Sequence, residues 1–214
     1  MFVLAMCGAG FASAQTDTNS TPAASTSAEV KEEEPSWSWS ASAYGYIVPD
    51  SREFVVPVVT ADRGVLHLEA RYNYEGLDSG SVWAGYNVSG SDHEIEWEIT
   101  PMFGVVFGDT RGVAPGYKGS VSWWKLELYS EGEYVFDTDN SSDSFFYNWS
   151  ELSISPLEWC RLGLVTQRTR LYQTDRDVQR GFLFGASLKR IDLTVYVFNP
   201  DDEPTWVFAG GFNF

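Results

Sequence analysis

The sequence predicts an all-β protein: a transmembrane, antiparallel, up-and-down β-barrel of about twelve strands, with ten strands as the alternative. Three observations predict this fold. From residue 36 onward the chain alternates between large apolar residues and polar or small ones, and turn signals interrupt the alternation regularly. Aromatic residues make up 16% of the chain, yet after the first residues no apolar run is long enough for a membrane-spanning helix. The last strand carries aromatic residues at alternate positions up to the end of the chain.

The last strand, residues 205–214, has one large aromatic face and one small face. The aromatic face consists of Trp206, Phe208, Gly210, Phe212 and Phe214. A soluble protein seldom ends on such a strand, because the aromatic face needs both a partner strand and an apolar environment. The pattern resembles the closing strand of bacterial outer-membrane β-barrels, which also serves as their assembly signal. The resemblance implies that Trp206, Phe208, Phe212 and Phe214 are recognised by the barrel-assembly machinery.

Three regions follow from composition along the chain. Residues 1–14 are apolar and end in Ala-Ser-Ala, which predicts a secretory signal peptide. Residues 15–35 are rich in Ser, Thr, Ala, Pro and charge, and we expect a disordered tail on the periplasmic side. Residues 36–214 form the barrel.

Strand number can be tested by parity, because both ends of an outer-membrane barrel lie on the periplasmic side and the count must be even. The weakest strand is 53–60, which Pro57 interrupts. Omitting it would require two other segments to merge into a ten-stranded barrel. The twelve predicted strands are 36–48, 53–60, 65–75, 81–89, 93–107, 117–130, 133–138, 144–155, 158–171, 178–189, 191–199 and 204–214.

The alternation of strands assigns each connection to one rim. The predicted periplasmic turns are Ala61–Gly64, Ser89–Asp92, Ser130–Gly132, Ser155–Leu157 and Arg190. The predicted external connections are Gly76–Gly80, Gly108–Gly116, Thr138–Ser142, Thr174–Asp177 and Asn199–Pro204. The longest, Gly108–Gly116, either folds into the lumen as a constriction or is an ordinary exposed loop.

The two faces of each strand differ in polarity, and the large apolar face is expected to meet lipid. Its members include Leu66, Leu68, Ala70, Tyr72, Tyr74, Val82, Ile95, Trp97, Phe103, Leu128, Leu164, Phe184, Leu193 and Val197. The opposite face supplies the lumen-facing candidates. These are His67, Glu69, Arg71, Glu94, Glu96, Glu98, Lys125, Glu127, Glu151, Arg161 and Asp192.

Beyond the last strand, residues 60–88 and 123–152 resemble uncharacterised outer-membrane barrel proteins of Gram-negative bacteria. The resemblance implies a bacterial outer-membrane location and contact with membrane lipid and lipopolysaccharide. It implies no activity, because the group has none established.

Glu94, Glu96 and Glu98 alternate along one strand, so their carboxylates share a face at intervals of about 7 Å. One interpretation is a stripe that attracts cations into a water-filled lumen. The other is an ion-pair network in which Lys125, Arg71 and Arg161 neutralise these acids. The acids assigned to the lumen outnumber the bases, which favours a cation preference if a pore exists.

Other functions have weaker support in the sequence. His67 with Glu69 raises the possibility of hydrolysis, but no Ser is singled out as a nucleophile, so we expect no enzyme and no catalytic residue. Two histidines without paired spacing predict no metal site, and no cofactor is expected. The net charge of -16 excludes nucleic acid as a partner. Arg168, Arg170, Arg176 and Arg180 either meet lipopolysaccharide phosphates or neutralise Asp175 and Asp177.

The sequence therefore predicts a narrow, passive, porin-like channel for small polar solutes or cations. A plugged structural or binding barrel is the alternative, and a barrel-embedded hydrolase is the third hypothesis.

Overall fold

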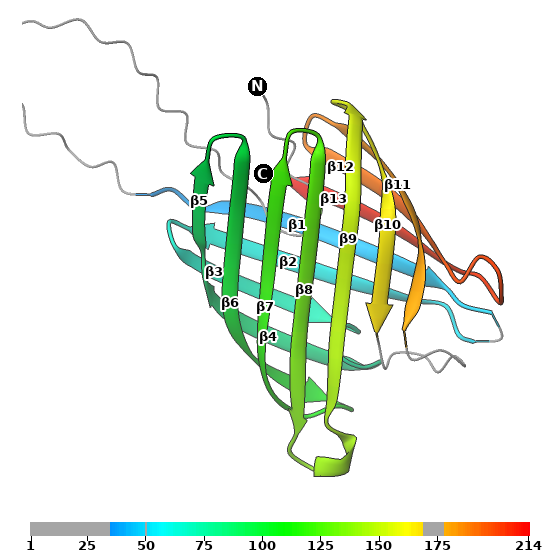
Figure 1. The fold of residues 1–214 in the computed structure, drawn as a ribbon. Coiled ribbons are helices and arrows are strands. Elements are labelled where there is room, and N and C mark those ends of the chain that lie inside the picture. The colour runs from blue at the N-terminus through cyan, green and yellow to red at the C-terminus, as the bar shows by residue number, and fades with distance from the viewer. Residues whose placement is uncertain (1–34, 50, 169–177) are drawn as a thin grey trace, which may run out of the picture.

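The computed structural model describes residues 35–49, 51–168 and 178–214. The signal peptide and the tail predicted for residues 1–35 lie outside this range except for Pro35. Within the described residues, no helix is long and apolar enough to cross a membrane. Most of the described residues belong to one antiparallel sheet, which curls until its two edges meet (Figure 1).

The sheet closes into a twelve-stranded barrel. Except between β4 and β5, each strand pairs with its neighbours in sequence, and β13 pairs with β1. β4 and β5 both pair with β6 and together count as one strand of the barrel. The strands are β1 (Ser38–Ile47), β2 (Phe54–Arg63), β3 (Leu66–Tyr72), β4 (Ser79–Tyr86), β5 (Val88–Asp92), β6 (Ile95–Gly108), β7 (Gly112–Trp123), β8 (Leu126–Asp137), β9 (Phe145–Leu157), β10 (Cys160–Arg168), β11 (Gln179–Leu188), β12 (Ile191–Phe198) and β13 (Thr205–Asn213). A short 3₁₀ turn, η1 (Ser141–Asp143), lies between β8 and β9.

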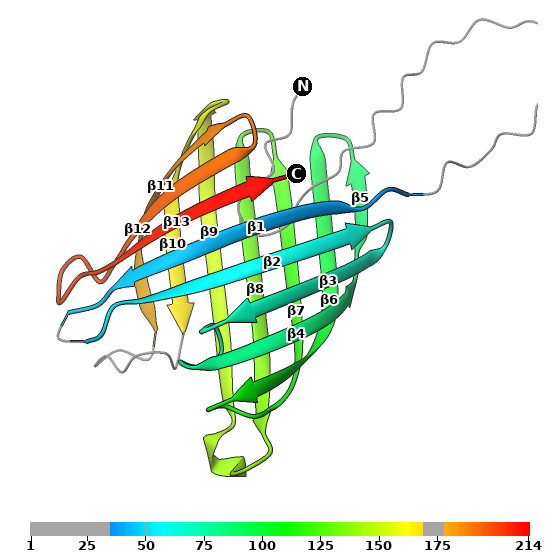
Figure 2. The same cartoon turned by 180° about the vertical axis from the view of Figure 1, so that it is seen from behind.

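The start of the first barrel strand and the end of the last lie at the same rim, as an even number of strands requires. Trp39 and Phe214 exchange two backbone hydrogen bonds there, of 3.1 and 3.0 Å. The rim that holds the termini also carries the two-residue turns, whereas the longer connections and η1 lie at the opposite rim (Figures 1 and 2). The twelve-stranded prediction is confirmed, and the ten-stranded alternative is wrong because β2 is a full strand.

Several predicted turns are wrong, because glycine does not mark turns in this part of the barrel. Ser130–Gly132 lies inside β8, where a Cβ on Gly132 would lie 2.9 Å from the ring of Tyr117. Ser89–Asp92 is β5, in which Gly90 makes room for the ring of Trp97 in the same way. These glycines admit a cross-strand aromatic ring, so they belong to the middle of strands.

Two of the true turns contain neither glycine nor asparagine. The chain reverses at Trp124 and at His93, and both residues adopt positive φ angles, 54° and 55°. The predicted external loop Gly108–Gly116 shrinks to residues 109–111, because β7 begins at Gly112. Within this stretch, a Cβ on Gly112 would lie 2.3 Å from the backbone oxygen of Phe136. The proposed long loop and its possible constriction are therefore wrong.

The large apolar face points outward, as predicted for nearly every member. Leu66, Val82, Ile95, Phe103, Leu164, Phe184 and Leu193 are all exposed on the outer wall. The same holds for the four aromatic residues of the last strand, Trp206, Phe208, Phe212 and Phe214. A continuous apolar outer wall around a polar interior is the arrangement that a lipid environment stabilises.

Tyr74 is the exception to the predicted face assignment. It follows the end of β3 and its side chain is buried in the barrel interior instead of facing lipid. The strand alternation stops at Tyr72, so the period of two that assigns faces no longer applies at Tyr74.

A pair of substitutions tests whether the outer wall meets lipid. Leu164 lies in the middle of β10, and Leu188 ends β11 beside a turn. In lipid vesicles, L164R should lower the free energy of unfolding by about 2–4 kcal/mol and L188R by about 0–1 kcal/mol, because the cost of a charge depends on its depth in the bilayer. Urea unfolding measures both. Equal costs for the two variants would contradict a membrane-facing wall.

Candidate functional site

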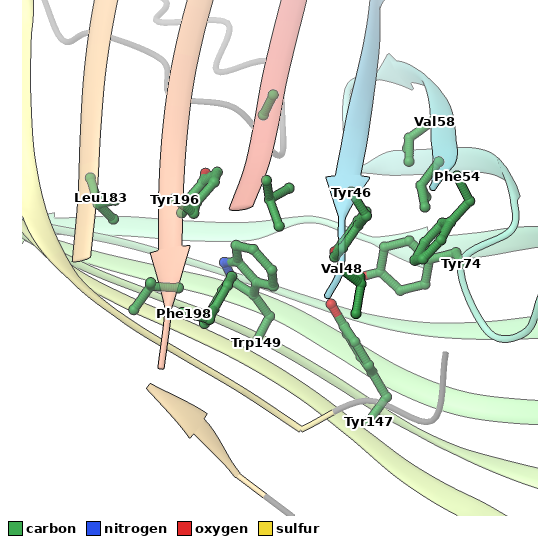
Figure 3. Packing of buried hydrophobic residues seen from close by; sticks show 14 residues of the cluster. Tyr46, Val48, Phe54, Val58, Tyr74, Tyr147, Trp149, Leu183, Tyr196 and Phe198 are labelled. Carbon is green, nitrogen blue, oxygen red and sulfur yellow. The ribbon is translucent and has the colours of Figure 1, made fainter. Parts of the chain in front are cut away.

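The barrel interior is the candidate functional site, and its half farther from the termini contains a cluster of buried apolar side chains. Figure 3 shows Tyr46, Phe54, Trp149, Tyr196 and Phe198 directed toward one another across the lumen. The ring centroids of Trp149 and Tyr196 lie 5.0 Å apart, and those of Trp149 and Phe198 lie 5.4 Å apart, both edge to face. Aromatic packing of this kind narrows the half of the lumen that is farther from the termini.

Beside this cluster lies an ionic network built from β2, β3, β7 and β8. Glu69 is at its centre: Arg71 donates from Nε, Lys118 donates from Nζ, and His67 Nε2 lies 3.1 Å away. Arg71 also donates to Glu133 at 2.8 Å. These charges are buried yet paired, as buried charges must be.

His67 is enclosed between two carboxylates, since its Nδ1 lies 2.8 Å from Asp62 Oδ1. Asn87 also donates to Asp62, at 2.9 Å. No hydroxyl group is recorded as a partner of either ring nitrogen in the described part of the chain. Both ring nitrogens of His67 therefore contact carboxylates. A barrel-embedded hydrolase would instead need a serine hydroxyl beside the histidine.

The connection between β3 and β4 reaches into the lumen. Glu75, after the end of β3, accepts hydrogen bonds from Ser81 at 2.6 Å and Trp83 at 3.2 Å, and lies 3.5 Å from Arg71. Its exposed fraction is 2%. Nothing in the sequence marked Glu75 as inward-pointing, because it lies beyond the regular alternation of β3.

A second ionic centre lies on the opposite wall. Arg161 of β10 donates to Glu151 of β9 at 2.5 Å, and Glu151 also accepts from Trp149 at 2.8 Å and Tyr196 at 3.0 Å. Arg161 further donates to Thr194 at 3.4 Å. Through these hydrogen bonds, the second centre connects Trp149 and Tyr196 of the aromatic cluster with Arg161 of β10 and Thr194 of β12.

Between the two centres lies a small cavity with a predominantly aromatic wall. Five tyrosines, Trp149 and Val56 line it together with the carboxylates of Glu131 and Glu151. Tyr129 donates to Glu131 at 2.7 Å, and Tyr74 donates to its other oxygen. Burial raises the pKa of the Tyr74 hydroxyl well above its usual range, so this group remains a neutral donor. Sequence reasoning missed Glu131, because it was assigned to a turn.

The predicted lumen-facing residues divide into two groups. His67, Glu69, Arg71, Glu151, Arg161 and Asp192 are buried in the barrel wall or its interior, and Glu127 is partly buried. Glu94, Glu96 and Lys125 are exposed at the rim with the short turns, and Glu98 is partly exposed. The three glutamates thus lie at the start of β6, beside the turn that precedes it and away from the cavity. Lys125 donates to the backbone of Pro156 rather than to these acids.

The charge of the inner network is unequal. Glu69, Glu75, Glu131 and Glu133 share Arg71 and Lys118, whereas His67 also faces Asp62. Two oxygens of this network, Glu75 Oε2 and Glu133 Oε1, are buried without a hydrogen-bond partner among the described residues. The network therefore holds more carboxylates than cations. Of the arginines expected near the external rim, Arg168 and Arg180 are exposed on the described strands, and Arg170 and Arg176 lie outside the described residues.

Comparison with solved structures identifies the fold. The KdgM porin has a TM-score of 0.57 at 11% identity, covering 82% of this chain and 99% of the porin chain. The chain has the fold of an outer-membrane porin barrel. The KdgM porin in complex with disordered oligogalacturonate gives a TM-score of 0.55 at 11% identity over the same shares.

The outer membrane protein Omp33 of Acinetobacter baumannii gives a TM-score of 0.45 at 9% identity, over 85% of this chain and 99% of that chain. No protein-family model and no curated protein matches the sequence. The porin barrel fold and the apolar outer wall together agree with the bacterial outer-membrane barrel expected from the sequence.

The Arg161–Glu151 pair gives a stability prediction. E151Q should destabilise the barrel by about 3–5 kcal/mol, because it leaves the buried Arg161 charge without its counterion. E96Q removes an exposed carboxylate by the same chemical change and should cost less than about 0.5 kcal/mol. Urea unfolding in lipid vesicles compares the two. A similar small cost for both variants would contradict a buried, mutually dependent ion pair.

Proposed function

We propose that the protein is a narrow passive channel of the bacterial outer membrane that admits small polar solutes with a preference for cations. The observation that carries the proposal is the position of Glu131, on the inward face of β8 and in the wall of the cavity. Its side chain is 13% exposed, more than the other carboxylates of the network. A carboxylate at a narrow point in a low-dielectric wall attracts cations and repels anions.

The surrounding charges support the same preference. Lys118 is the basic group recorded beside Glu131, with 3.8 Å between its Nζ and Glu131 Oε2, and it is bonded more closely to Glu69. Glu127 lies on the same inward face of β8 and is partly exposed. An oligogalacturonate carries carboxylates, so the ligand named for the KdgM complex is not transferred to this acid-lined interior.

The position of both barrel ends at one rim supports a proposed orientation. The proposed arrangement has the tail in the periplasm, the short turns at the periplasmic rim and η1 on the outside. The exposed apolar wall would contact lipid and lipopolysaccharide, and the aromatic residues of β13 would be read by the assembly machinery.

A plugged structural or binding barrel is the second candidate, and a specific observation favours it. Tyr196, Phe198 and Val207 have exposed fractions of 1%, 0% and 0%, which places an apolar cluster across the external half of the lumen. In this candidate the ionic network serves stability alone.

Single-channel recording of the refolded protein in a planar bilayer separates the candidates. The wild type should carry a small cation-selective current across a salt gradient. E131Q should reduce the ratio of cation to anion permeability by about twofold or more, because it removes the charge at the narrow point. The matched control is E96Q, at the exposed end of β6, which should leave the ratio unchanged.

Two results would contradict the proposal. A folded barrel that carries no current would leave the plugged scaffold. An equal loss of selectivity in E96Q and E131Q would move the selective step from the cavity to the rim.

A further inference from the structure

The cavity beside Glu131 has the composition of a cation-binding site rather than of a passive gap. Its wall combines aromatic rings with two carboxylates, and no basic side chain is among the described residues that line it. The free space is about the size of one water molecule. A small polar group of a larger solute could therefore enter it.

The two carboxylates of the cavity differ in their available charge. Glu151 is paired closely with Arg161, so its charge is largely compensated. Glu131 accepts hydrogen bonds from two neutral hydroxyls, those of Tyr74 and Tyr129, which orient its oxygens without neutralising them. Lys118 Nζ lies 3.8 Å from Glu131 and bonds more closely to Glu69, so Glu131 is less fully paired than Glu151 at the edge of the cavity.

The network behind the cavity adds to this negative charge. Four glutamates of the network, including Glu131, share Arg71, Lys118 and the imidazole of His67, which also faces Asp62. One additional positive charge in the cavity would reduce the imbalance. The stabilisation would be large because the surroundings are buried and of low dielectric constant.

The aromatic wall suits a positively charged group as well. Tyr74 and Tyr147 pack edge to face at 5.0 Å, and Tyr44 packs against Trp149 at 6.4 Å in the same manner. Ring faces attract cations that have lost part of their hydration shell. The contact of Arg71 over the Tyr74 ring, at 4.2 Å, is an example of this interaction next to the cavity.

We propose that this cavity binds the ammonium head of primary amines, with the alkyl chain lying along the tyrosine wall. A primary ammonium is about the size of a water molecule and has three donors, which suits Glu131 and the surrounding hydroxyls. A quaternary ammonium is too large for the space, and sodium is held strongly by its own hydration shell. The inference deepens the proposed channel function, since it names the solute class that the narrow point selects.

Binding is tested apart from conduction, on the refolded full chain in detergent micelles. Isothermal titration calorimetry is performed with methylammonium, tetramethylammonium, potassium and sodium chlorides at constant ionic strength. Methylammonium should bind saturably and at least about tenfold more tightly than the other three ions. E131Q should weaken methylammonium binding about tenfold or more, whereas E96Q should bind as the wild type does.

The wild-type ion series requires no substitution, so the inference remains testable even if E131Q does not fold. Absence of methylammonium binding would overturn it, as would equal binding of potassium or tetramethylammonium. Unchanged binding in folded E131Q would also overturn it. A barrel that binds methylammonium but carries no current would contradict the channel alone, and a conducting barrel that does not bind it would contradict the amine site alone.

Discussion

The pairing of β13 with β1 is the constraint on which the rest of the structure depends. Eight residues of β1, from Ser40 to Ile47, pair with Asn213 to Trp206 in antiparallel register. Lipid offers no hydrogen-bond partners to the backbone, so a strand edge left open within the bilayer would be unstable. Antiparallel closure requires an even number of barrel strands, and it places the start of the first strand and the end of the last at the same rim. It also forces the polar face of every strand into a shared interior.

That shared interior must satisfy its own charges. The barrel solves this with two centres, one around Glu69 and one around Arg161, on opposite walls. The aromatic cluster fills the space toward the rim opposite the termini. Trp149 belongs both to this cluster and to the hydrogen-bond network of Glu151. The cavity at Glu131 lies where the polar side chains of the ionic centres meet the apolar side chains of the cluster. Selectivity and stability therefore depend on overlapping sets of side chains.

Much of the fold could be predicted from alternation, because strand pleating places apolar residues on one wall over long stretches. The interior residues His67, Glu69, Arg71, Glu151 and Arg161 followed from the same rule. The rule could not reveal Tyr74 and Glu75, which turn inward after β3 has ended.

Glycine caused several of the remaining errors. Gly132 was interpreted as a turn signal, although its role is to admit the ring of Tyr117 from the neighbouring strand. The real turn at Trp124 has positive φ without glycine or asparagine. This misplacement also hid Glu131 from the candidate site. Cross-strand contacts of this kind are not visible in the local sequence. Glu94 and Glu96 alternate correctly but lie too near the end of β6 to reach the interior.

The inward position of Glu75 links the outer surface of the molecule to its interior. The connection that bears Glu75 begins and ends at the rim opposite the termini, and Asn73 in the same connection donates to the backbone of Val55 in β2. Glu75 meanwhile reaches Arg71, Ser81 and Trp83 below. Any molecule that binds this connection would contact the segment whose carboxylate holds the central arginine. One buried side chain thus connects the surface at this rim to the ion pairs of the lumen.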